Sequence, residues 1–489
     1  MRRSSQPDVA LSSNSTLRSR AESLRILLLA LIAVCLPGML CFTSARAEAP
    51  TLKLPEYQTR KLDNGMTLLL MKHGEEPLVN FEMWILDGSA ADPTKHAGLA
   101  SLCAESLRKG AGDRDAAAFA EALDFLGANL TTGVDHDRTA ISFQCLSKDF
   151  DEGLALFADA VLRPSFDSHE VEKLAQQMSE NVSQAKDNPR FVLGEYHDAH
   201  LYGDHPYGQP VDGTEKSLVG VKAEDLRSFY RDHYGADRAV LAVVGNFDMD
   251  HAASLLQKTF AGMPAARVAR TKVPAPKPVK GREVLLVNKP DTPQTWFHIG
   301  SLGPKWGDPD YAAGELVRTV FGGRFTSWLN TKLRIESGLS YGAGYTIDRR
   351  RQAGSAYISS FTAKETTEKA LDLALQTLKR LHEKGLDQDE LNSARAYLKG
   401  QTPYRYESNG SLARVLCLIT AYDLGREFVD GRFAALDRVS LDDCKAAIAR
   451  WYPEQNLSFT CIGVASEVKD VLAKYGKLRV RENDEPGFH

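Results

Sequence analysis

The chain has 489 residues, which is enough for two to four domains at about 100–200 residues each. Hydrophobic residues make up 43% and charged residues 25%, values that are typical of a globular protein and exclude a disordered or fibrous one. The net charge of −4 lacks the positive excess that drives nucleic-acid binding, so we expect no nucleic-acid partner.

Residues 1–47 have the three parts of a secretory signal peptide. Five arginines precede an apolar run over residues 26–42, and Ala45-Arg46-Ala47 follows it as a small-x-small cleavage site. An uncleaved membrane anchor is the alternative, although Pro37-Gly38 interrupts the run and its length is marginal for a bilayer core of about 30 Å. We therefore expect export to a bacterial periplasm and no stable membrane span after cleavage.

The rest of the chain is predicted to form two domains and a tail. We place an amino-terminal half at 50–265, a linker at 266–281, a carboxy-terminal half at 282–475 and a tail at 476–489. The linker is rich in proline and lysine: three prolines and four basic residues lie between Val268 and Gly281. This composition is typical of an extended segment.

Strands and helices follow the same order in both halves. In the first half, apolar runs and alternation predict strands over 66–71, 79–85, 138–146 and 239–245, and helices over 98–109, 150–161, 168–186 and 225–234. In the second half they predict strands over 282–287, 296–300, 354–361 and 457–463, and helices over 311–321, 325–335, 365–384 and 443–452.

A shift of 218 residues superimposes matching positions of the two halves, such as Asp225 on Asp443 and Gly245 on Gly463. Chance similarity of two modules is the alternative, but a duplicated α+β unit explains the match better. We expect each half to be a mostly antiparallel sheet with helices packed on one face. The two halves would then face each other as a clamshell around a chamber.

Most other chemistry-bearing residues give weak signals. Five cysteines lie outside residues 1–47 without a C-x-x-C pair, so they are expected to be buried, and the choice of any disulfide stays open. His197 and His200 are three apart, with Glu195 and His205 nearby, but a metal there would need a fourth convergent ligand. No G-x-S-x-G nucleophile motif occurs.

Several short motifs carry a family resemblance. They are Gly88-Ser89, Ala97-Gly98-Leu99-Ala100, His205-Pro-Tyr-Gly208 and Leu333-Arg334-x-x-x-Gly338-Leu339-x-Tyr341. Together they resemble the insulinase/pitrilysin zinc metallopeptidases, the inverzincins, over about residues 55–475. The similarity is closest to the short branch related to mitochondrial processing peptidase.

The zinc motif of that family is absent here. Zinc-binding members have H-x-x-E-H directly after Gly-Leu-Ala. This chain has Ser101 and Glu105 at the two histidine positions and Ala104 at the position of the general base. The family's third ligand, a downstream glutamate, aligns with Glu180. Serine and two carboxylates suit zinc poorly, since zinc prefers imidazole or thiolate, so we expect no metal in this chain.

The resemblance assigns the remaining chemistry to Arg334 and Tyr341. In the family such a pair positions the scissile peptide and stabilises the developing oxyanion from the half opposite the zinc. A guanidinium offers paired donors and a phenol offers one, which suits both roles. The alternative is that Arg334 is a solvated charge at a helix end and Tyr341 is packing. Gly322-Gly323 is expected to permit a close helix–helix turn, with a substrate-contacting loop as its alternative.

The resemblance therefore implies a zinc-less subunit of a heteromeric metallopeptidase. Its partner would be a family subunit that carries the zinc motif and holds the zinc, and its substrates would be short unfolded peptides. It would not be catalytic alone. The main alternative is a non-catalytic scaffold or peptide-binding subunit of a larger complex, and a further one is a self-sufficient hydrolase with an unusual metal.

Overall fold

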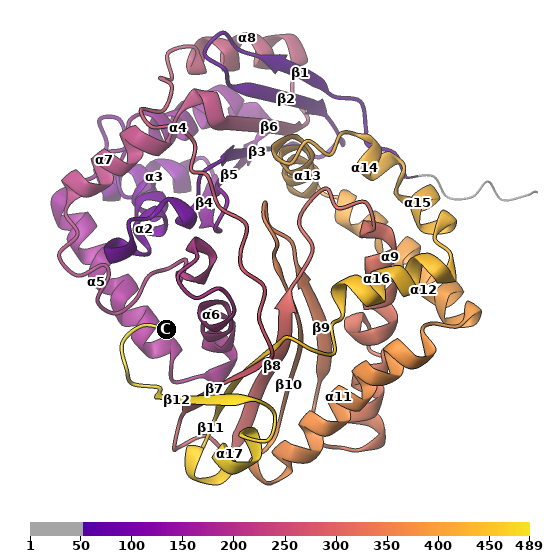
Figure 1. Cartoon of the computed structure of the whole chain (residues 1–489). Coiled ribbons are helices and arrows are strands. Elements are labelled where there is room, and N and C mark those ends of the chain that lie inside the picture. Colours follow the sequence, from indigo (N-terminus) through magenta and orange to yellow (C-terminus); the bar gives the residue numbers. More distant parts are fainter. Residues whose placement is uncertain (1–51) are drawn as a thin grey trace, which may run out of the picture. The chain divides into compact units, whose positions relative to one another are not determined.

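The computed structural model describes residues 52–489, which form one unit, so the signal-peptide and anchor interpretations lie outside the described residues (Figure 1). Within 52–489, no helix is long and apolar enough to cross a membrane. Two six-stranded sheets organise this unit, one built from each half.

The first sheet has the strand order β1-β2-β6-β3-β5-β4, and only the β2–β6 pair is parallel. Its strands are β1 (Gln58–Lys61), β2 (Thr67–Lys72), β3 (Leu78–Ile85), β4 (Asn129–Val134), β5 (Thr139–Leu146) and β6 (Ala239–Gly245). The helices of this half are α2 (Leu99–Ser106), α3 (Ala116–Phe125), α4 (Phe150–Leu162), α5 (Ser168–Ala185), α6 (Pro189–Tyr202), α7 (Ala223–His233) and α8 (Met249–Phe260).

The second sheet has the order β12-β7-β11-β8-β10-β9, with β7 parallel to both of its neighbours. Its strands are β7 (Arg282–Asn288), β8 (Gln294–Leu302), β9 (Ala343–Asp348), β10 (Ser355–Ala363), β11 (Leu457–Gly463) and β12 (Lys477–Glu482). Its helices are α9 (Tyr311–Arg318), α10 (Trp328–Asn330), α11 (Thr367–Lys384), α12 (Gln388–Gln401), α13 (Asn409–Ala421), α14 (Glu427–Asp430), α15 (Arg432–Arg438), α16 (Leu441–Trp451) and α17 (Ala465–Leu472). Two homologous, mostly antiparallel halves are thus confirmed.

Local chemistry explains the repeated positions found in the sequence. Asp225 and Asp443 are not the first residues of their helices but the third. Each carboxylate accepts a hydrogen bond, at 2.8 Å, from the backbone N–H of the residue just before the helix. Such a capping box fixes a helix start, so both helices begin two residues earlier than predicted. The central strands β6 and β11 are buried along their whole length, as their unbroken apolar runs predicted.

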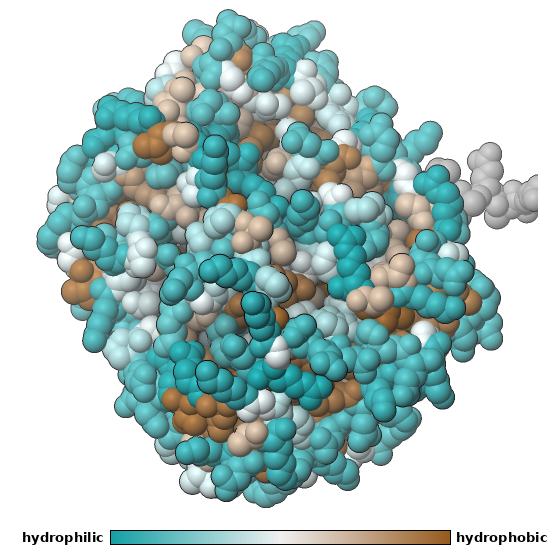
Figure 2. All heavy atoms as spheres, viewed as in Figure 1, coloured by the Kyte–Doolittle hydropathy of each residue, from teal (hydrophilic) through white to brown (hydrophobic). Residues whose placement is uncertain are grey.

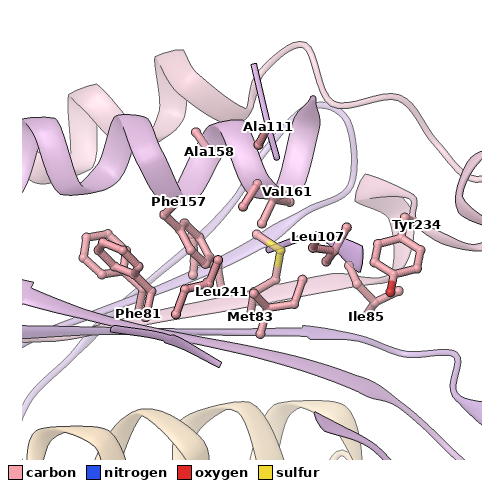
Figure 3. Close-up of a cluster of buried hydrophobic side chains, with 14 of the residues drawn as sticks. Phe81, Met83, Ile85, Leu107, Ala111, Phe157, Ala158, Val161, Tyr234 and Leu241 are labelled. Atoms are coloured by element: carbon pink, nitrogen blue, oxygen red, sulfur yellow. The ribbon is translucent and has the colours of Figure 1, made fainter. Parts of the chain in front are cut away.

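The core of the first half lies between its sheet and its helices (Figure 3). Phe81 and Leu241 of adjacent strands pack with Phe157 of α4, and Leu107 and Val161 extend the same layer. Burying side chains of this size contributes about 1.5–3 kcal/mol each. The five cysteines of the described residues are buried and free, in agreement with their reading as small hydrophobic residues.

Each half sends one helix onto the sheet of the other (Figure 1). Helix α13 packs on β3 and β6, where Leu412 and Leu416 contact the apolar side of the first sheet. Helix α6 packs on β8 and β11, and Leu193 lies in a cluster with Ile462. The second face of each sheet is therefore covered by a helix of the other half, because both faces of each sheet are apolar.

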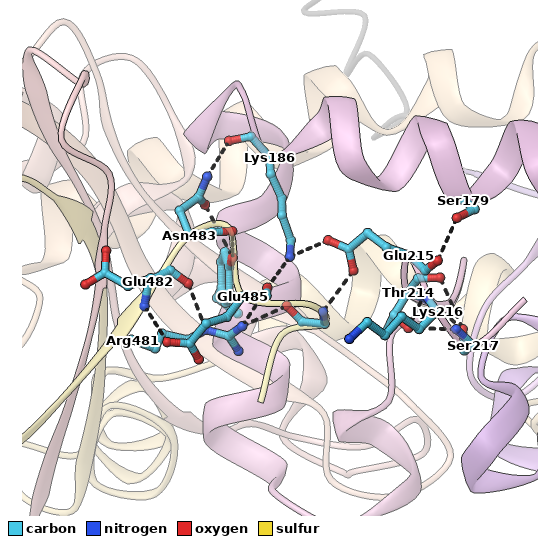
Figure 4. Close-up of polar contacts among 12 residues, drawn as sticks. Ser179, Lys186, Thr214, Glu215, Lys216, Ser217, Arg481, Glu482, Asn483 and Glu485 are labelled. Atoms are coloured by element: carbon cyan, nitrogen blue, oxygen red, sulfur yellow. Dashed lines mark hydrogen bonds and ion pairs between the residues drawn. The ribbon is translucent and has the colours of Figure 1, made fainter. Parts of the chain in front are cut away.

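The predicted linker and tail are both fixed to the body. The linker is extended, and the carbonyl of Val268 accepts a bond from Arg238 while that of Val273 accepts one from Gln352. Residues 476–489 are more than a tail, because they include strand β12. Beyond it the chain crosses to the first half, where Lys186 donates to the carbonyl of Glu485 (Figure 4) and Phe488 is buried.

Candidate functional site

Helix α2, which carries the degenerate zinc motif, begins in a rigid turn. Gly98 precedes it with a φ of 89°, and a Cβ there would lie 2.7 Å from the backbone of Gly213, so only glycine fits. The Asp92 carboxylate accepts bonds from the N–H groups of Gly98 and Ala100, both at 2.8 Å. The motif positions are therefore held firmly.

Internal contacts engage the motif positions of α2. Ser101 Oγ donates to the Val211 carbonyl at 2.8 Å, and Ala104 is a buried methyl group. Glu105 accepts a bond from Thr132 Oγ1 of β4 at 2.6 Å and lies 3.5 Å from Arg108 Nε. Since the hydroxyl and the carboxylate already have partners, neither is an uncommitted metal ligand.

Glu180 does not join this group. It is exposed and accepts a bond from Gln176 at 2.9 Å on the outer side of α5. A cavity of about 510 Å³ beside Glu105 is lined from α5 by Gln177 and Asn181 instead. Within residues 52–489, no three His, Cys, Asp or Glu side chains converge as metal ligands. The side chains that line this cavity offer carboxylates and amides, a donor set that does not fit zinc, which prefers imidazole or thiolate.

The histidines near α6 have structural surroundings. His197 is buried with its ring centroid 5.2 Å from that of His298 and 4.9 Å from that of Tyr357, across the contact between the halves. His205 caps a short turn, because its Nδ1 accepts the N–H of Tyr207 at 3.0 Å. Their side chains serve different contacts, which disfavours the alternative metal site.

Arg334 and Tyr341 come together at the surface of the second half. Residues Thr331–Glu336 form a π-helical turn that continues α10, so the helix predicted over 325–335 is present, although it begins only at Trp328 and its second part is π-helical. Gly338 ends the turn with a φ of 63°, and its N–H donates to the Arg334 carbonyl at 3.2 Å. The chain then returns through Tyr341 to β9, as predicted. π-Helical turns are frequent at functional sites.

The Arg334 guanidinium lies against two exposed aromatic rings. Its Cζ is 4.3 Å from the ring centroid of Tyr341 and 4.9 Å from that of Phe325, which are 75% and 61% exposed. Among the described residues, neither the Arg334 guanidinium nor the Tyr341 hydroxyl has a hydrogen-bonding partner or an opposing carboxylate. The stacking orders the guanidinium while leaving its N–H donors free for a ligand.

The two glycines before this turn serve close packing. A Cβ on Gly322 would lie 2.3 Å from the backbone nitrogen of Tyr345, so the π-helical turn Thr319–Gly323 approaches β9 to within backbone contact. The close approach expected at Gly322-Gly323 is thus present, but it joins a helix to a strand rather than two helices. Phe325, which shares the Arg334 guanidinium with Tyr341, had no signal in the sequence because its role depends on that turn.

Comparison with protein families assigns both halves. Residues 68–215 match the model described as Insulinase (Peptidase family M16), and residues 220–398 match the model described as Peptidase M16 inactive domain. The chain belongs to the insulinase family. Within it, this member lacks the zinc motif, and the match to an inactive-domain model agrees with a chain that is not catalytic alone.

Relatives of this insulinase-family chain include proteases and a respiratory-complex subunit. It is 27% identical over 323 residues to an uncharacterized zinc protease of Mycobacterium leprae (strain TN), covering 65% of this chain and 72% of the relative. It is 24% identical to the uncharacterized zinc protease YmxG of Bacillus subtilis (strain 168), covering 71% and 84%. It is also 27% identical to cytochrome b-c1 complex subunit 1, mitochondrial, of Bos taurus, covering 55% and 56%.

Solved structures agree with the family. A crystal structure of a peptidase M16 inactive domain from Pseudomonas fluorescens superimposes with a TM-score of 0.79 at 26% identity, covering 83% of this chain and 98% of that one. A protease from Helicobacter pylori superimposes with a TM-score of 0.77 at 17% identity, covering 84% and 100%, which supports the fold alone.

Proposed function

We propose that this chain is an exported, zinc-less subunit of a heteromeric insulinase-family metallopeptidase. It binds short unfolded peptides through Arg334 and Tyr341 and presents them to the zinc of a partner subunit that carries the intact motif. The periplasm of a bacterium is its proposed location.

One observation supports this proposal more than any other. The Arg334 guanidinium is ordered by two rings, yet its donors and the Tyr341 hydroxyl have no partner in residues 52–489. A surface charge that only stabilised its own fold would be expected to pair with a carboxylate. Free donors at an ordered position suit a peptide carbonyl, and a phenol suits the oxyanion that forms during hydrolysis.

A second candidate is a scaffold subunit without a substrate. It is favoured by the similarity to a subunit whose name places it in the cytochrome b-c1 complex. The two candidates differ in what they require of Arg334 and Tyr341, because a scaffold needs neither side chain for activity. Cleavage and assembly must therefore be measured on the same samples.

The experiment is peptide cleavage by this chain reconstituted with a zinc-motif subunit of the family. Tyr341→Phe removes one donor and keeps the ring, so the cleavage rate should fall by roughly 10²–10³ while the complex stays intact on size exclusion. Arg334→Lys should rescue only part of the loss seen with Arg334→Ala, since an ammonium lacks the planar fork. Tyr404→Phe is the control, because Tyr404 is also exposed, at 71%.

The outcomes separate the candidates. Wild-type cleavage by both Tyr341→Phe and Arg334→Ala in an intact complex contradicts substrate positioning and leaves the scaffold. Elemental analysis of the isolated chain supplies a second measurement, since tightly held, near-stoichiometric zinc in it would contradict the zinc-less assignment.

A further inference from the structure

The second half contains a structural counterpart of the degenerate zinc-motif position. β4 and β9 are both edge strands, and their bounds are 214 residues apart, Asn129 to Ala343 and Val134 to Asp348. The same shift places the motif positions of α2 on Glu315, Arg318 and Thr319 of α9 and the turn that follows it. The pair Glu315 and Arg318 therefore lies where the first half has the degenerate motif.

These residues form the centre of a buried charge cluster. Glu315 is 5% exposed, and its two oxygens lie 3.0 Å from Arg318 Nη2 and 2.9 Å from Arg349 Nη1. Burial alone raises the pKa of Glu315, but the arginines lower it to about 2, so the group is a carboxylate at neutral pH. One negative charge is thus shared by two guanidinium groups.

Two further arginines add positive charge without a carboxylate of their own. Arg432 is 6% exposed, lies over the ring of Tyr311 and donates to its hydroxyl at 3.3 Å, while its Nε has no partner. Arg405 is exposed, and no salt bridge to it is present among the described residues. Partly buried guanidinium groups in excess of carboxylates favour the binding of an anion.

A cavity of about 320 Å³ opens on this cluster. Arg318, Arg349 and Arg405 line it together with the aromatic rings of Trp306 and Tyr311, and residues 345–348 of β9 form one wall. Its one other acid, Asp348, already pairs with Arg350 at 2.8 Å. The lining combines positive charge with apolar surface, which suits a carboxylate attached to an apolar group.

We propose that this cavity binds the carboxylate of a peptide that lies beside β9. The inference rests on the proposed function and specifies its substrate class: peptides with a free carboxyl group about six residues from the scissile bond. β9 joins Tyr341 to Arg349, and six extended residues span about 20 Å, so one peptide reaches both places. Trp306 and Tyr311 then contact the side chain next to the carboxylate.

The test is direct binding of labelled heptapeptides to the isolated chain, measured by fluorescence anisotropy. Two peptides differ only at the last residue, which ends in a carboxylate or an amide. The carboxylate form should bind at least tenfold more tightly, because charge-assisted bonds to arginine are lost in the amide. Equal affinities overturn the proposal.

Two arginine variants test whether the carboxylate preference arises in this cavity. Arg405→Gln leaves both pairs of Glu315 intact, and Arg432→Gln removes the guanidinium over Tyr311. Each should reduce the carboxylate preference several-fold without changing the affinity of the amide, whereas Arg190→Gln, an exposed arginine of the first half, should keep it. If Arg405→Gln and Arg432→Gln both keep the full preference at wild-type melting temperature, the site lies elsewhere and the proposal is wrong.

Inorganic phosphate distinguishes a free anion from a peptide end. Phosphate should displace the peptide only at concentrations far above that of the unlabelled peptide, and displacement at equal concentration would make the ligand a free anion. The assay contains neither partner nor cleavage. Normal cleavage by Tyr341→Phe in the reconstituted pair would therefore contradict the proposed function without affecting the carboxylate preference. Loss of the preference alone would contradict the carboxylate site.

Discussion

Helices α6 and α13 occupy equivalent places in the two halves but make chemically different contacts. A shift of 218 residues places Ala199 on Cys417, and each helix covers the sheet of the other half. The face of α13 that meets β3 and β6 is apolar, with Leu412 and Leu416 fully buried. The contact of α6 contains ionisable groups, including His197 and Asp198. A duplicated fold thus has one contact with several ionisable groups and one that is apolar apart from Glu82 of β3, whose pKa is raised by burial.

The largest loss is expected where the α6 contact depends on a buried ion pair. Arg350 lies 2.5 Å from Asp198 of α6 and 2.8 Å from Asp348. Arg350→Met leaves Asp198 without its counter-charge, so the free energy of unfolding should fall by about 3–5 kcal/mol. Urea unfolding followed by circular dichroism measures this. Arg350→Met combined with Asp198→Asn should recover part of the loss. A loss below about 1 kcal/mol in Arg350→Met alone would show that the α6 contact does not depend on this ion pair.

The apolar contact should respond to volume and not to pH. Leu416→Ala removes buried methyl groups between α13 and the first sheet, which should cost about 2–4 kcal/mol. The cost should change little between pH 5 and pH 8, because the lost contacts are apolar and the ionisable group of this contact, Glu82 of β3, keeps its bonds from Trp84 and Ser142. Val219→Ala, at an apolar residue that is 69% exposed, is the control. A cost for Leu416→Ala that changed strongly with pH would remove the contrast between the helices.

Acid should weaken the α6 contact through its histidines. Burial lowers the pKa of His298 to about 3 and that of the neighbouring His197 well below its usual value. Between about pH 6.5 and these values the unfolded chain binds protons that the folded chain does not, so stability falls as the pH falls. At pH 5 His298 costs about 2 kcal/mol, and His197 adds to this cost in the same direction. His298→Gln should flatten the pH profile of unfolding, and His169→Gln, an exposed histidine, should leave it unchanged.

The sequence predicted what depends on local pattern. Strands β6 and β11 matched their predicted bounds because unbroken apolar runs identify buried strands. Asp225 and Asp443 marked their helices because capping is a short-range interaction. The exchange of α6 and α13 was not predictable, since an amphipathic face does not specify which sheet it will cover.

In the candidate site, too, the sequence predicted only what depends on local geometry. Gly338 identified a helix end and brought Arg334 near Tyr341, a placement that needs only local geometry. Glu180 was chosen from alignment alone, and one residue of register decides whether a side chain of α5 faces the cavity, as Asn181 does. The cluster around Glu315 was missed because Arg349, Arg405 and Arg432 come from segments far from it in the sequence.

The smallest predicted effect is a loss of stability at high pH that comes from a glutamate of α6. Glu195 of α6 lines the cavity beside the degenerate motif, and burial, with Asp198 and Asp212 nearby, raises its pKa to about 7. The folded chain therefore holds a proton there that the unfolded chain releases near pH 4.5. Stability must fall as the pH rises from that value through about 7, opposite to the histidines.

Glu195→Gln tests how much of the pH dependence of stability comes from Glu195. The amide resembles the protonated acid, so the variant should match the wild type at pH 5. At pH 8 it should be more stable by about 1–2 kcal/mol, less than the full shift implies because the cavity admits water. Melting curves at the two pH values measure the difference. Glu172→Gln, at an exposed glutamate of α5 paired with Lys222, should show no such gain at pH 8. Equal stability of Glu195→Gln and the wild type at both pH values would mean that Glu195 is ionised in the folded protein, and the contact of α6 would then titrate only on the acid side.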